Sequence, residues 1–442
     1  MINIIMLTHW LGGDIYPFIT LGQQFQKRGH KVTLLTHCIY SQATKKAGLE
    51  FEPVDEYSEY RNMFLRFEDF ADPINNKEGT ENFIREFEND THIVKEVELI
   101  KKHIVEGADN IIICRHRSSV AGLLASEKFN IPVLSVFLAP NYVAHLQLHE
   151  QIIGDFMKGV INKAREALEL KPIKCWTNWM CSPKGVIGQW PKGYASEVKE
   201  ILPTIKEVGF LVKEDNDKEP LPEEIVEFLE SHDEPIIISG GTSRYVCEEL
   251  YQEAVLGCEK LNLPAIVVCP NEVFLPKISN DNIISVGFVN LQQLMKYARA
   301  IIHHGGINTS GEASFASIPQ LILAHYADRP DNGQRLQKEK IARWLPRKMW
   351  TADNVVSCLN EILTTETKSY CENYAQKVTK ISCCDSYLDT IDKAIKDDEF
   401  IMGKLEKQII NDEPSPVSVT NQLDERKKLL LKLALERKKK VG

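Results

Sequence analysis

AIIHHGGINTSGEASFASIPQLILAHYADRPDN, at residues 300–332, decides the fold of this chain. A short β-branched run leads into two histidines and a glycine pair, then into a helical stretch, and then into a second apolar run at Gln320–Ala324. This order of strand, glycine turn, helix and strand is typical of a βαβ unit in a parallel sheet. A helix that begins just after such a turn directs free backbone N–H groups towards a phosphate.

The turn and its helix carry polar groups that suit a nucleotide diphosphate. Gly305, Gly306 and the backbone at 308–310 can donate hydrogen bonds to phosphate oxygens, and His304 adds a donor. Glu312, about one turn into the helix, is placed to accept hydrogen bonds from ribose hydroxyls. Taken singly, His304 would be a strand-end histidine and Glu312 a surface charge, but the combination favours a nucleotide site.

A second glycine turn lies near the N-terminus, in THWLGGDIYPFITLGQQFQKRG at residues 8–29. Gly12 and Gly13 permit a tight turn into a helix, and Asp14 stands at the mouth of the predicted sheet. Asp14 is interpreted either as the N-cap of that helix or as a general base, and the residues alone leave both open. His9 is a rival base, with an ordinary core histidine as the alternative.

A third glycine turn is PIIISGGTS, at residues 235–243. It follows an apolar run and precedes two hydroxyl side chains. Backbone N–H groups and hydroxyls in such a turn can hold a phosphate at a helix start. Glycine turns after strands are common, so this one carries weight only together with residues 300–332.

Short apolar runs alternate with amphipathic stretches along the chain, which predicts two series of parallel strands. The expected strands are Ile2–Leu7, Val32–Thr36, Asn110–Cys114 and Pro132–Phe137, then Pro235–Ser239, Ala265–Cys269, Ile283–Gly287, Ala300–His303 and Gln320–Ala324. Between the series, KEDNDKEPLP at 213–222 is polar and proline-bearing, which indicates a linker and a hinge. The expected division is a domain over 1–212, a linker over 213–234, a second domain over 235–385, a helix over 386–402 whose return to the first domain stays open, and a spacer with a short charged helix over 403–442.

The bulk composition excludes several classes of function. The 442 residues suffice for two cores, and the formal net charge of −9 disfavours nucleic-acid binding. Eleven cysteines without metal-ligand spacing predict reduced thiols in a cytoplasmic protein and no metal site. We expect no signal peptide and no transmembrane segment, since no apolar run approaches about 18 residues. Peripheral contact with a membrane stays open.

These motifs together resemble the UDP-glycosyltransferase superfamily, closest to its bacterial natural-product and sterol-type members. The amino-terminal pattern of that family appears as Gly13-Asp14-Ile15-Tyr16-Pro17, Leu21-Gly22 and Arg28-Gly29-His30, and its carboxy-terminal signature appears at 304–332. The resemblance covers residues 1 to about 400. It implies an α/β fold of two Rossmann-like, doubly wound parallel-sheet domains that face each other across a cleft (GT-B), here followed by a C-terminal helical tail.

The resemblance also implies roles for single residues. The catalytic base falls on Asp14, with His9 as the alternative. The implied donor-binding residues are Gly13, Ser239, Gly241, Thr242, Phe288, Val289, His304, Gly305, Gly306, Asn308, Thr309, Glu312, Asp328 and Arg329. Of these, Glu312 would bind the ribose, the pair at 328–329 the sugar hydroxyls, and the pair at 288–289 the base. The expected acceptor-binding residues are Arg115, His116, Asn141 and His145.

Two positions depart from the family pattern. Asn308 replaces a usual glycine, and asparagine tolerates the left-handed conformations that glycine adopts. Arg329 replaces a usual glutamine, and a permanent cation beside the sugar makes an acidic donor sugar conceivable. The run at 115–118, Arg-His-Arg-Ser, stands where the family often has a polar partner for the base. Its basic groups would hold an acidic acceptor or stabilise an ionised Asp14, and a solvated loop is equally compatible.

The predicted reaction is a single displacement with inversion, in which Asp14 takes the proton of an acceptor hydroxyl. The expected donor is a UDP- or dTDP-sugar, without cofactor or metal, and the acceptor is a secondary metabolite, as in antibiotic biosynthesis, or a lipid-like aglycone. The alternatives are a nucleotide-sugar epimerase of the same fold and a non-catalytic glycosyltransferase-like binding or activator protein. The leucine-rich charged segment at 423–440 predicts a terminal helix with a solvated basic face, with docking to an assembly-line protein as the alternative.

Overall fold

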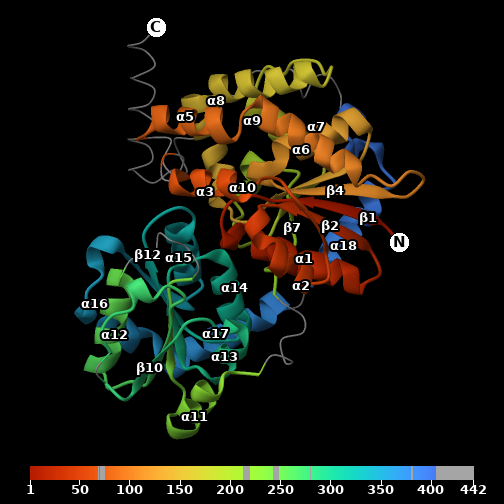
Figure 1. Ribbon diagram of the computed structural model, residues 1–442. Helices are drawn as coiled ribbons and strands as arrows, with labels where there is room; N and C mark the ends of the chain where they lie inside the picture. The colour runs from red at the N-terminus through yellow and green to blue at the C-terminus, as the bar shows by residue number, and fades with distance from the viewer. Residues whose placement is uncertain are drawn as a thin grey trace.

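A computed structural model describes residues 1–404 except 68, 70–74, 213–219, 242–247, 279 and 380–381. It contains two parallel sheets, each with helices on both faces, which form the two bodies seen in Figure 1. The predicted fold class, two doubly wound parallel-sheet domains, is confirmed. Most of the linker predicted at 213–222 and the tail after residue 404 lie outside the described residues.

The first sheet has seven parallel strands in the order β3-β2-β1-β4-β5-β6-β7. They are β1 (Asn3–Leu7), β2 (Lys31–Thr36), β3 (Glu50–Pro53), β4 (Asn110–Arg115), β5 (Val133–Phe137), β6 (Val186–Gly188) and β7 (Lys206–Glu207). The central strand β1 pairs with β2 on one side and β4 on the other, with Asn3 opposite both Lys31 and Asn110. The strand order therefore reverses between β1 and β4.

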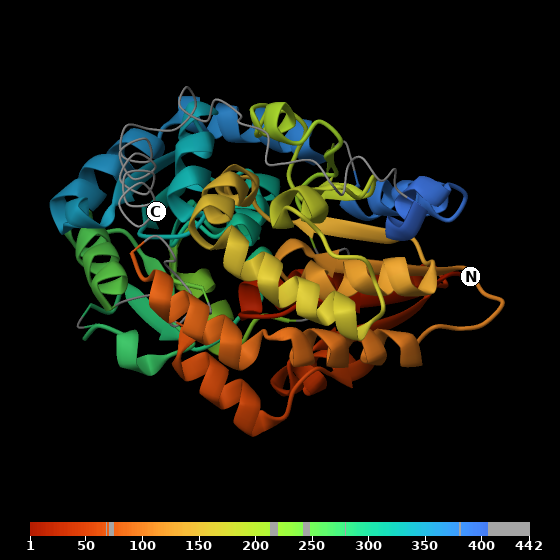
Figure 2. The ribbon, with the colours of Figure 1, turned by 90° about the horizontal axis from the view of Figure 1, so that it is seen from above.

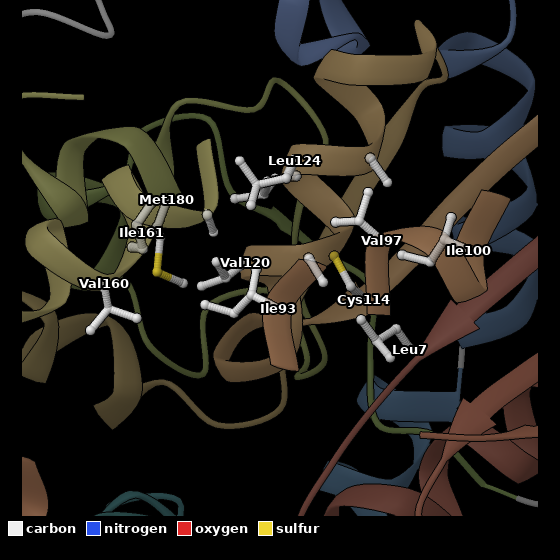
Figure 3. Packing of buried hydrophobic residues seen from close by; sticks show 14 of the residues in the cluster. Leu7, Ile93, Val97, Ile100, Cys114, Val120, Leu124, Val160, Ile161 and Met180 are labelled. Carbon is white, nitrogen blue, oxygen red and sulfur yellow. The ribbon is translucent and has the colours of Figure 1, made fainter. Parts of the chain in front are cut away.

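Alternate residues of these strands face different helix layers, as a buried parallel sheet requires. Leu7 and Cys114 point into one layer with Val97, Val120 and Met180 (Figure 3). The helices of that layer are α6 (Asp90–Lys102), α7 (Ser119–Phe129), α8 (Asn141–Ala167) and α9 (Trp176–Cys181). The opposite face packs on α1 (Gly12–Lys27) and α18 (Cys383–Ala394). The remaining helices of this domain are α2 (Ser41–Lys46), α3 (Tyr57–Leu65), α5 (Lys77–Phe87) and α10 (Val198–Ile201).

The second sheet has six parallel strands in the order β10-β9-β8-β11-β12-β13. They are β8 (Ile236–Ser239), β9 (Ala265–Val268), β10 (Ile283–Val286), β11 (Ala300–His303), β12 (Gln320–Ala324) and β13 (Ala342–Pro346). The helices are α11 (Glu223–Ser231), α12 (Glu248–Lys260), α13 (Leu291–Leu294), α14 (Ile307–Phe315), α15 (Arg329–Lys338), α16 (Ala352–Ile362) and α17 (Thr365–Thr379). This sheet repeats the topology of the first, with its reversal between β8 and β11.

The nine strands predicted from the sequence are all present, with no end shifted by more than one residue. Four further strands, β3, β6, β7 and β13, were not predicted. The first three are short strands at or near a sheet edge, and β13 carries Arg343 and Pro346 within its five residues. Edge strands bury less apolar surface than central ones, so their hydrophobic pattern is weak.

The two domains share an apolar contact layer. Phe210, Tyr194 and Phe137 of the first domain belong to one buried cluster with Ile307 and Leu336 of the second. In Figure 2, which looks down on the molecule, the first domain partly overlaps the second. A buried apolar interface of this kind restricts relative domain motion.

The chain returns to the first domain after α17. Tyr387 of α18 is fully buried among residues of β1 and α1, and its hydroxyl donates a hydrogen bond to Gln189 Oε1 at 3.0 Å. Figure 1 shows α18 beside β1, in the upper body. Among the described residues, none of the helices has the length and apolar character needed to cross a bilayer.

Candidate active site

In each sheet, a strand next to the point where the strand order reverses is followed by a glycine turn. In the first domain, the turn after β1 lies beside the end of β4; in the second, the turn after β8 lies beside the end of β11. In open parallel sheets, ligands bind at this point because adjacent loops diverge and leave a crevice. The helix α1 begins at the turn after β1 and α14 begins at the turn after β11, close to the boundary between the two bodies in Figure 1.

The ring of His304 fills space that two glycines leave open. A Cβ atom at Gly241 would lie 2.5 Å from Cε1 of this ring, and a Cβ at Gly306 would lie 2.5 Å from Nε2. Gly241 also has φ +73°, in the left-handed region that favours glycine. The glycine pairs of 240–241 and 305–306 are therefore parts of one structure, which holds His304 between the two turns.

The environment of His304 keeps its imidazole neutral. Burial lowers the pKa of His304 well below its usual value and the positive charge of Arg329 lowers it further, against a backbone hydrogen bond with Ser239 that raises it. Its Nδ1 atom is buried and has no hydrogen-bond partner within the described part of the chain. A buried polar atom without a partner marks a place that a ligand or water must satisfy.

His303, the neighbouring histidine, has a structural role. Its Nδ1 accepts a hydrogen bond from the Gly305 N–H at 3.2 Å, so its Nε2 carries the proton and donates to Gln320 Oε1 at 3.0 Å. Gln320 in turn donates to the Ser310 carbonyl at 3.4 Å, in the first turns of α14. Burial lowers the pKa of His303 to about 4, despite the contact with Gln320 that raises it. This network fixes the turn that presents His304.

Asn332 connects the same turn to the loop before α15. Its fully buried amide donates to the Gly305 carbonyl at 3.0 Å and to Asp328 Oδ2 at 2.8 Å. Burial raises the pKa of Asp328, against Arg329 and Asn332, which lower it. Sequence reasoning assigned no role to Asn332, although its spacing of four residues from Asp328 on one helix face is a usable signal.

Asp14 lies across the domain boundary from Asp328, and the charge of Asp14 contributes to the raised pKa of Asp328. Asp14 is the third residue of α1, and the N-cap is Leu11, so the N-cap interpretation of Asp14 is wrong. Its Oδ1 atom lies 2.6 Å from Nη2 of the buried Arg115, the last residue of β4. Of the roles considered for Arg115, the structure shows the pairing with Asp14.

Two buried side chains near this ion pair retain unused hydrogen-bonding groups. The Nε and Nη1 atoms of Arg115 and both polar side-chain atoms of Asn141 have no hydrogen-bond partner in the ranges that the structure describes. Asn141 begins α8, and the next residue, Tyr142, has its ring 5.8 Å from the Arg115 guanidinium. A polar ligand beside Asp14 could satisfy these groups.

A backbone carbonyl of α1 joins the two domains. Pro17 lies inside α1 and has no N–H, so the Gly13 carbonyl, four residues earlier, lacks its helical donor. The side chain of Asn308, at the start of α14, donates to this carbonyl at 3.1 Å. The asparagine that replaces the family glycine thus links the starts of the two helices.

His9 faces a cavity in the first domain. Its Nε2 lies 3.0 Å from Glu96 Oε1, and Trp10, next in the chain, has a left-handed backbone with φ 92°. The cavity, with its open mouth included, has a volume of about 810 Å³. A second cavity of about 540 Å³ shares Trp10, Glu88, Val120 and Met157 with the first. The other lining residues are a mixture of apolar side chains, mainly from α3, α5, α6, α7, α8 and α9, and of polar side chains that include several histidines and carboxylates.

Comparison with known proteins identifies both halves of the chain. Residues 4–146 match the glycosyltransferase family 28 N-terminal domain, and residues 265–383 match the erythromycin biosynthesis protein CIII-like C-terminal domain. The sterol 3-beta-glucosyltransferase UGT80A2 of Arabidopsis thaliana is 23% identical over 432 residues, which are 91% of this chain and 64% of that protein. UDP-glucuronosyltransferase 2C1 of Oryctolagus cuniculus is 26% identical over 214 residues, 46% of this chain and 40% of that one.

Solved structures agree in fold. The glycotransferase of kitacinnamycin superposes with a TM-score of 0.69 at 14% identity, covering 89% of this chain and 98% of that one. The spinosyn forosaminyltransferase SpnP gives 0.67 at 16% identity, covering 89% and 99%. The chain belongs to the UDP-glycosyltransferase superfamily. It spans less than two thirds of the length of several curated relatives, with 64% of the Arabidopsis protein and 23% of the Candida albicans sterol 3-beta-glucosyltransferase.

The other donor-site residues predicted for this UDP-glycosyltransferase are placed as follows. Ser239 is buried at the end of β8, where its Oγ accepts a hydrogen bond from the Gly241 N–H at 3.3 Å. Thr309 is buried in the first turn of α14, and Glu312 is half-buried further along it. After β10, Phe288 is 74% exposed while Val289 is buried. Thr242 lies outside the described residues.

Two predicted acceptor residues remain. His116 follows Arg115, stacks on Phe137 with ring centroids 4.1 Å apart, and lines the second cavity. His145 lies one turn into α8, with its ring 6.1 Å from that of His149, which also lines that cavity. Sequence reasoning did not find Glu96, the partner of His9, because it lies in the middle of an amphipathic helix without a motif.

We predict that the contribution of the Asn308–Gly13 hydrogen bond to the free energy of unfolding depends on Pro17. Asn308→Ala should lower the free energy of unfolding by about 1 kcal/mol, the net value of such a hydrogen bond. In a Pro17→Ala background, the restored N–H can bond the Gly13 carbonyl, so the same substitution should cost less. Denaturant unfolding of the four proteins measures this coupling, and equal costs in both backgrounds would contradict it.

The pairing of His9 with Glu96 predicts a pH-dependent stability. Burial alone would lower the pKa of His9, but the charges of Glu96, Glu88 and Asp55 outweigh burial and raise it. The pair should therefore stabilise the fold fully at pH below the unfolded value of about 6.5 and lose this effect as the pH rises through the folded pKa.

Glu96→Gln should consequently cost more stability at pH 6 than at pH 9, and NMR titration should show a lower pKa for His9. The exposed Glu98→Gln, on the same helix, is the matched control and should leave the titration unchanged. An unshifted His9 in Glu96→Gln would show that Glu96 is not its counter-charge.

Proposed function

We propose that this chain transfers a sugar from a nucleotide-diphosphate donor to a hydroxyl group of an apolar acceptor, with inversion at the anomeric carbon. The observation that supports this best is the facing of the two glycine turns across the domain boundary. One turn presents the half-buried, neutral His304 with a free Nδ1, and the other presents Asp14. The Asn308–Gly13 hydrogen bond joins them. A phosphate site and a carboxylate at opposite ends of one crevice suit a displacement in which the diphosphate leaves as a hydroxyl attacks.

The diphosphate would lie at the start of α14. The helix directs its first N–H groups and the positive end of its dipole at this place, and the imidazole of His304 borders it without a charge. The buried Ser310 Oγ has no partner among the described residues and offers another group. UDP or dTDP is the proposed leaving group, since fixed donors stabilise the charge that develops as the glycosidic bond breaks.

Asp14 would act as the base. An acceptor hydroxyl hydrogen-bonded to Asp14 transfers its proton to the carboxylate as its oxygen attacks the anomeric carbon. Arg115 holds one carboxylate oxygen at 2.6 Å and so orients the other. The unused groups of Asn141 and Arg115 would bind the polar end of the acceptor next to the reacting hydroxyl.

The two cavities would take the apolar part of the acceptor. Their linings combine aliphatic, methionine and tryptophan side chains, beginning at Trp10, with histidine and carboxylate side chains. Ligand sites commonly combine an apolar wall with a few polar groups. Of the two acceptor classes expected, we favour the lipid-like aglycone, because several curated relatives are named sterol 3-beta-glucosyltransferases.

A nucleotide-sugar epimerase has no need of a second substrate pocket, and the two cavities of the first domain therefore favour transfer. The non-catalytic alternative predicts a crevice that lacks reactive groups. The placing of Asp14 opposite His304 supports an enzyme.

Nucleotide binding should depend on the glycine that makes room for His304. UDP or dTDP should raise the melting temperature of the wild-type chain, because a ligand that binds only the native state stabilises it. Gly306→Ala should reduce this shift strongly, since its Cβ would displace the His304 ring. Gly159→Ala, where a Cβ has open space, should keep the shift. If neither nucleotide shifts the wild-type chain, the proposed function is wrong.

Asp14→Asn should bind the nucleotide normally and lose transfer. The loss should be about 10²-fold or more in kcat, the usual contribution of a general base. The measurement is sugar transfer to a panel of hydroxylated sterols and polyketides, alongside the nucleotide thermal shift. His9→Gln should retain more activity than Asp14→Asn; the reverse order would make His9, with Glu96, the base.

A further inference from the structure

Arg329 is a buried cation without an ion-pair partner among the described residues. Its residue is 8% exposed, yet it forms no ion pair with any residue that the structure describes. The guanidinium lies 5.2 Å from the ring centroid of Tyr326, which stabilises it through the ring face. The adjacent Asp328 is instead hydrogen-bonded to Asn332 at 2.8 Å. Buried charges in proteins are normally paired, so this cation indicates a missing anion.

The position of Arg329 lies beside the phosphate turn. Its carbonyl oxygen and Cβ come within 3.1 and 3.2 Å of the point where a Cβ of Gly305 would stand. Its charge also lowers the pKa of His304. The side chain therefore belongs to the second-domain wall of the crevice that holds His304.

The chemistry of transfer identifies what occupies the space next to it. In a displacement, the sugar is bonded to the diphosphate on one side and approached by the acceptor oxygen on the other. It must then lie between the His304 turn and Asp14. Asp328, the neighbour of Arg329, lies near both the His304 turn and Asp14. It accepts a hydrogen bond from Asn332, which also bonds that turn, and the charge of Asp14 raises its pKa. The 328–329 pair thus borders the sugar.

We propose that Arg329 selects a donor whose sugar carries a carboxylate, such as a nucleotide-linked uronic acid. This inference rests on the proposed function and names its substrate class. A guanidinium offers two parallel N–H groups that match the two oxygens of a carboxylate. The β-phosphate is a second source of anionic oxygens, but α14 and His304 already direct donors to it. Asp328, with one oxygen held by Asn332, would accept a hydrogen bond from a sugar hydroxyl.

The test compares UDP, UDP-glucose and UDP-glucuronate, of which the last two differ only in the group at C6. Isothermal titration should show the wild-type chain binding UDP-glucuronate about tenfold more tightly than UDP-glucose, as a charge-assisted bidentate pair implies. Arg329→Gln should lose about this factor for UDP-glucuronate and change the other two ligands less than about twofold. The control is Arg343→Gln, which removes a half-buried arginine of β13 that pairs with Glu361 of α16. This variant should bind all three ligands as the wild type does.

The possible results distinguish a failure of the inference about Arg329 from a failure of the proposed function. Equal binding of both sugars by the wild-type chain would overturn the inference. An equal loss for all three ligands in Arg329→Gln would assign Arg329 to the diphosphate and also overturn it. If UDP and dTDP both fail to bind the wild-type chain, the proposed function itself fails and the inference falls with it. A lower melting temperature of Arg329→Gln would reveal a folding defect. In that case Arg329→Lys, which keeps the charge but loses the two parallel N–H groups, should still prefer UDP-glucuronate over UDP-glucose, by a smaller factor than the wild type.

Discussion

The carbonyl oxygen of Gly13 is the constraint on which the arrangement of the site depends. Pro17 deprives it of its helical donor, and Asn308, 295 residues later, supplies one from the other domain. This bond links the starts of α1 and α14, in addition to the apolar interface between the domains. Both helix starts carry a partial positive charge, so their approach favours an anion between them. The backbone alone therefore suits the crevice to a diphosphate, without a contribution from basic side chains.

The sequence predicted the frame of the molecule because the frame is local. Each central strand, its glycine turn and the following helix lie within about 30 residues, and their periodicities are independent of the rest of the chain. The contact of His304 with Gly241 was not predicted, because it forms only when β11 pairs with β8 and brings the two glycine turns together. The short strands β6 and β7 were missed because three and two residues carry too little pattern.

The partners of the site residues were harder to predict because they come from distant elements. Arg115 was considered as a partner of Asp14 from its place at a strand end, and that place is what brings it across the reversal point. Glu96 approaches His9 only after α6 packs on the sheet, and the interdomain role of Asn308 requires both domains in place. In the sequence, Asn308 is seen only as a replacement of the usual glycine. The structure supplies a reason for the asparagine, because its side chain bonds the carbonyl that Pro17 leaves without a helical donor.

The two candidate bases have opposite electrostatic surroundings, and this difference assigns them different tasks. Asp14 faces a cation, which neutralises its charge and fixes its direction at the crevice; His9 faces carboxylates, which favour its protonated form. A protonated histidine cannot accept a proton from the acceptor, but it can donate a hydrogen bond to an acceptor oxygen inside the cavity. Because the apolar interface holds the domains in contact and Asn332 fixes the loop at 328, these groups are in place before a donor arrives. Discrimination between donors would then come from charges already fixed in the crevice, and Arg329 is the one whose counter-charge the described residues do not supply.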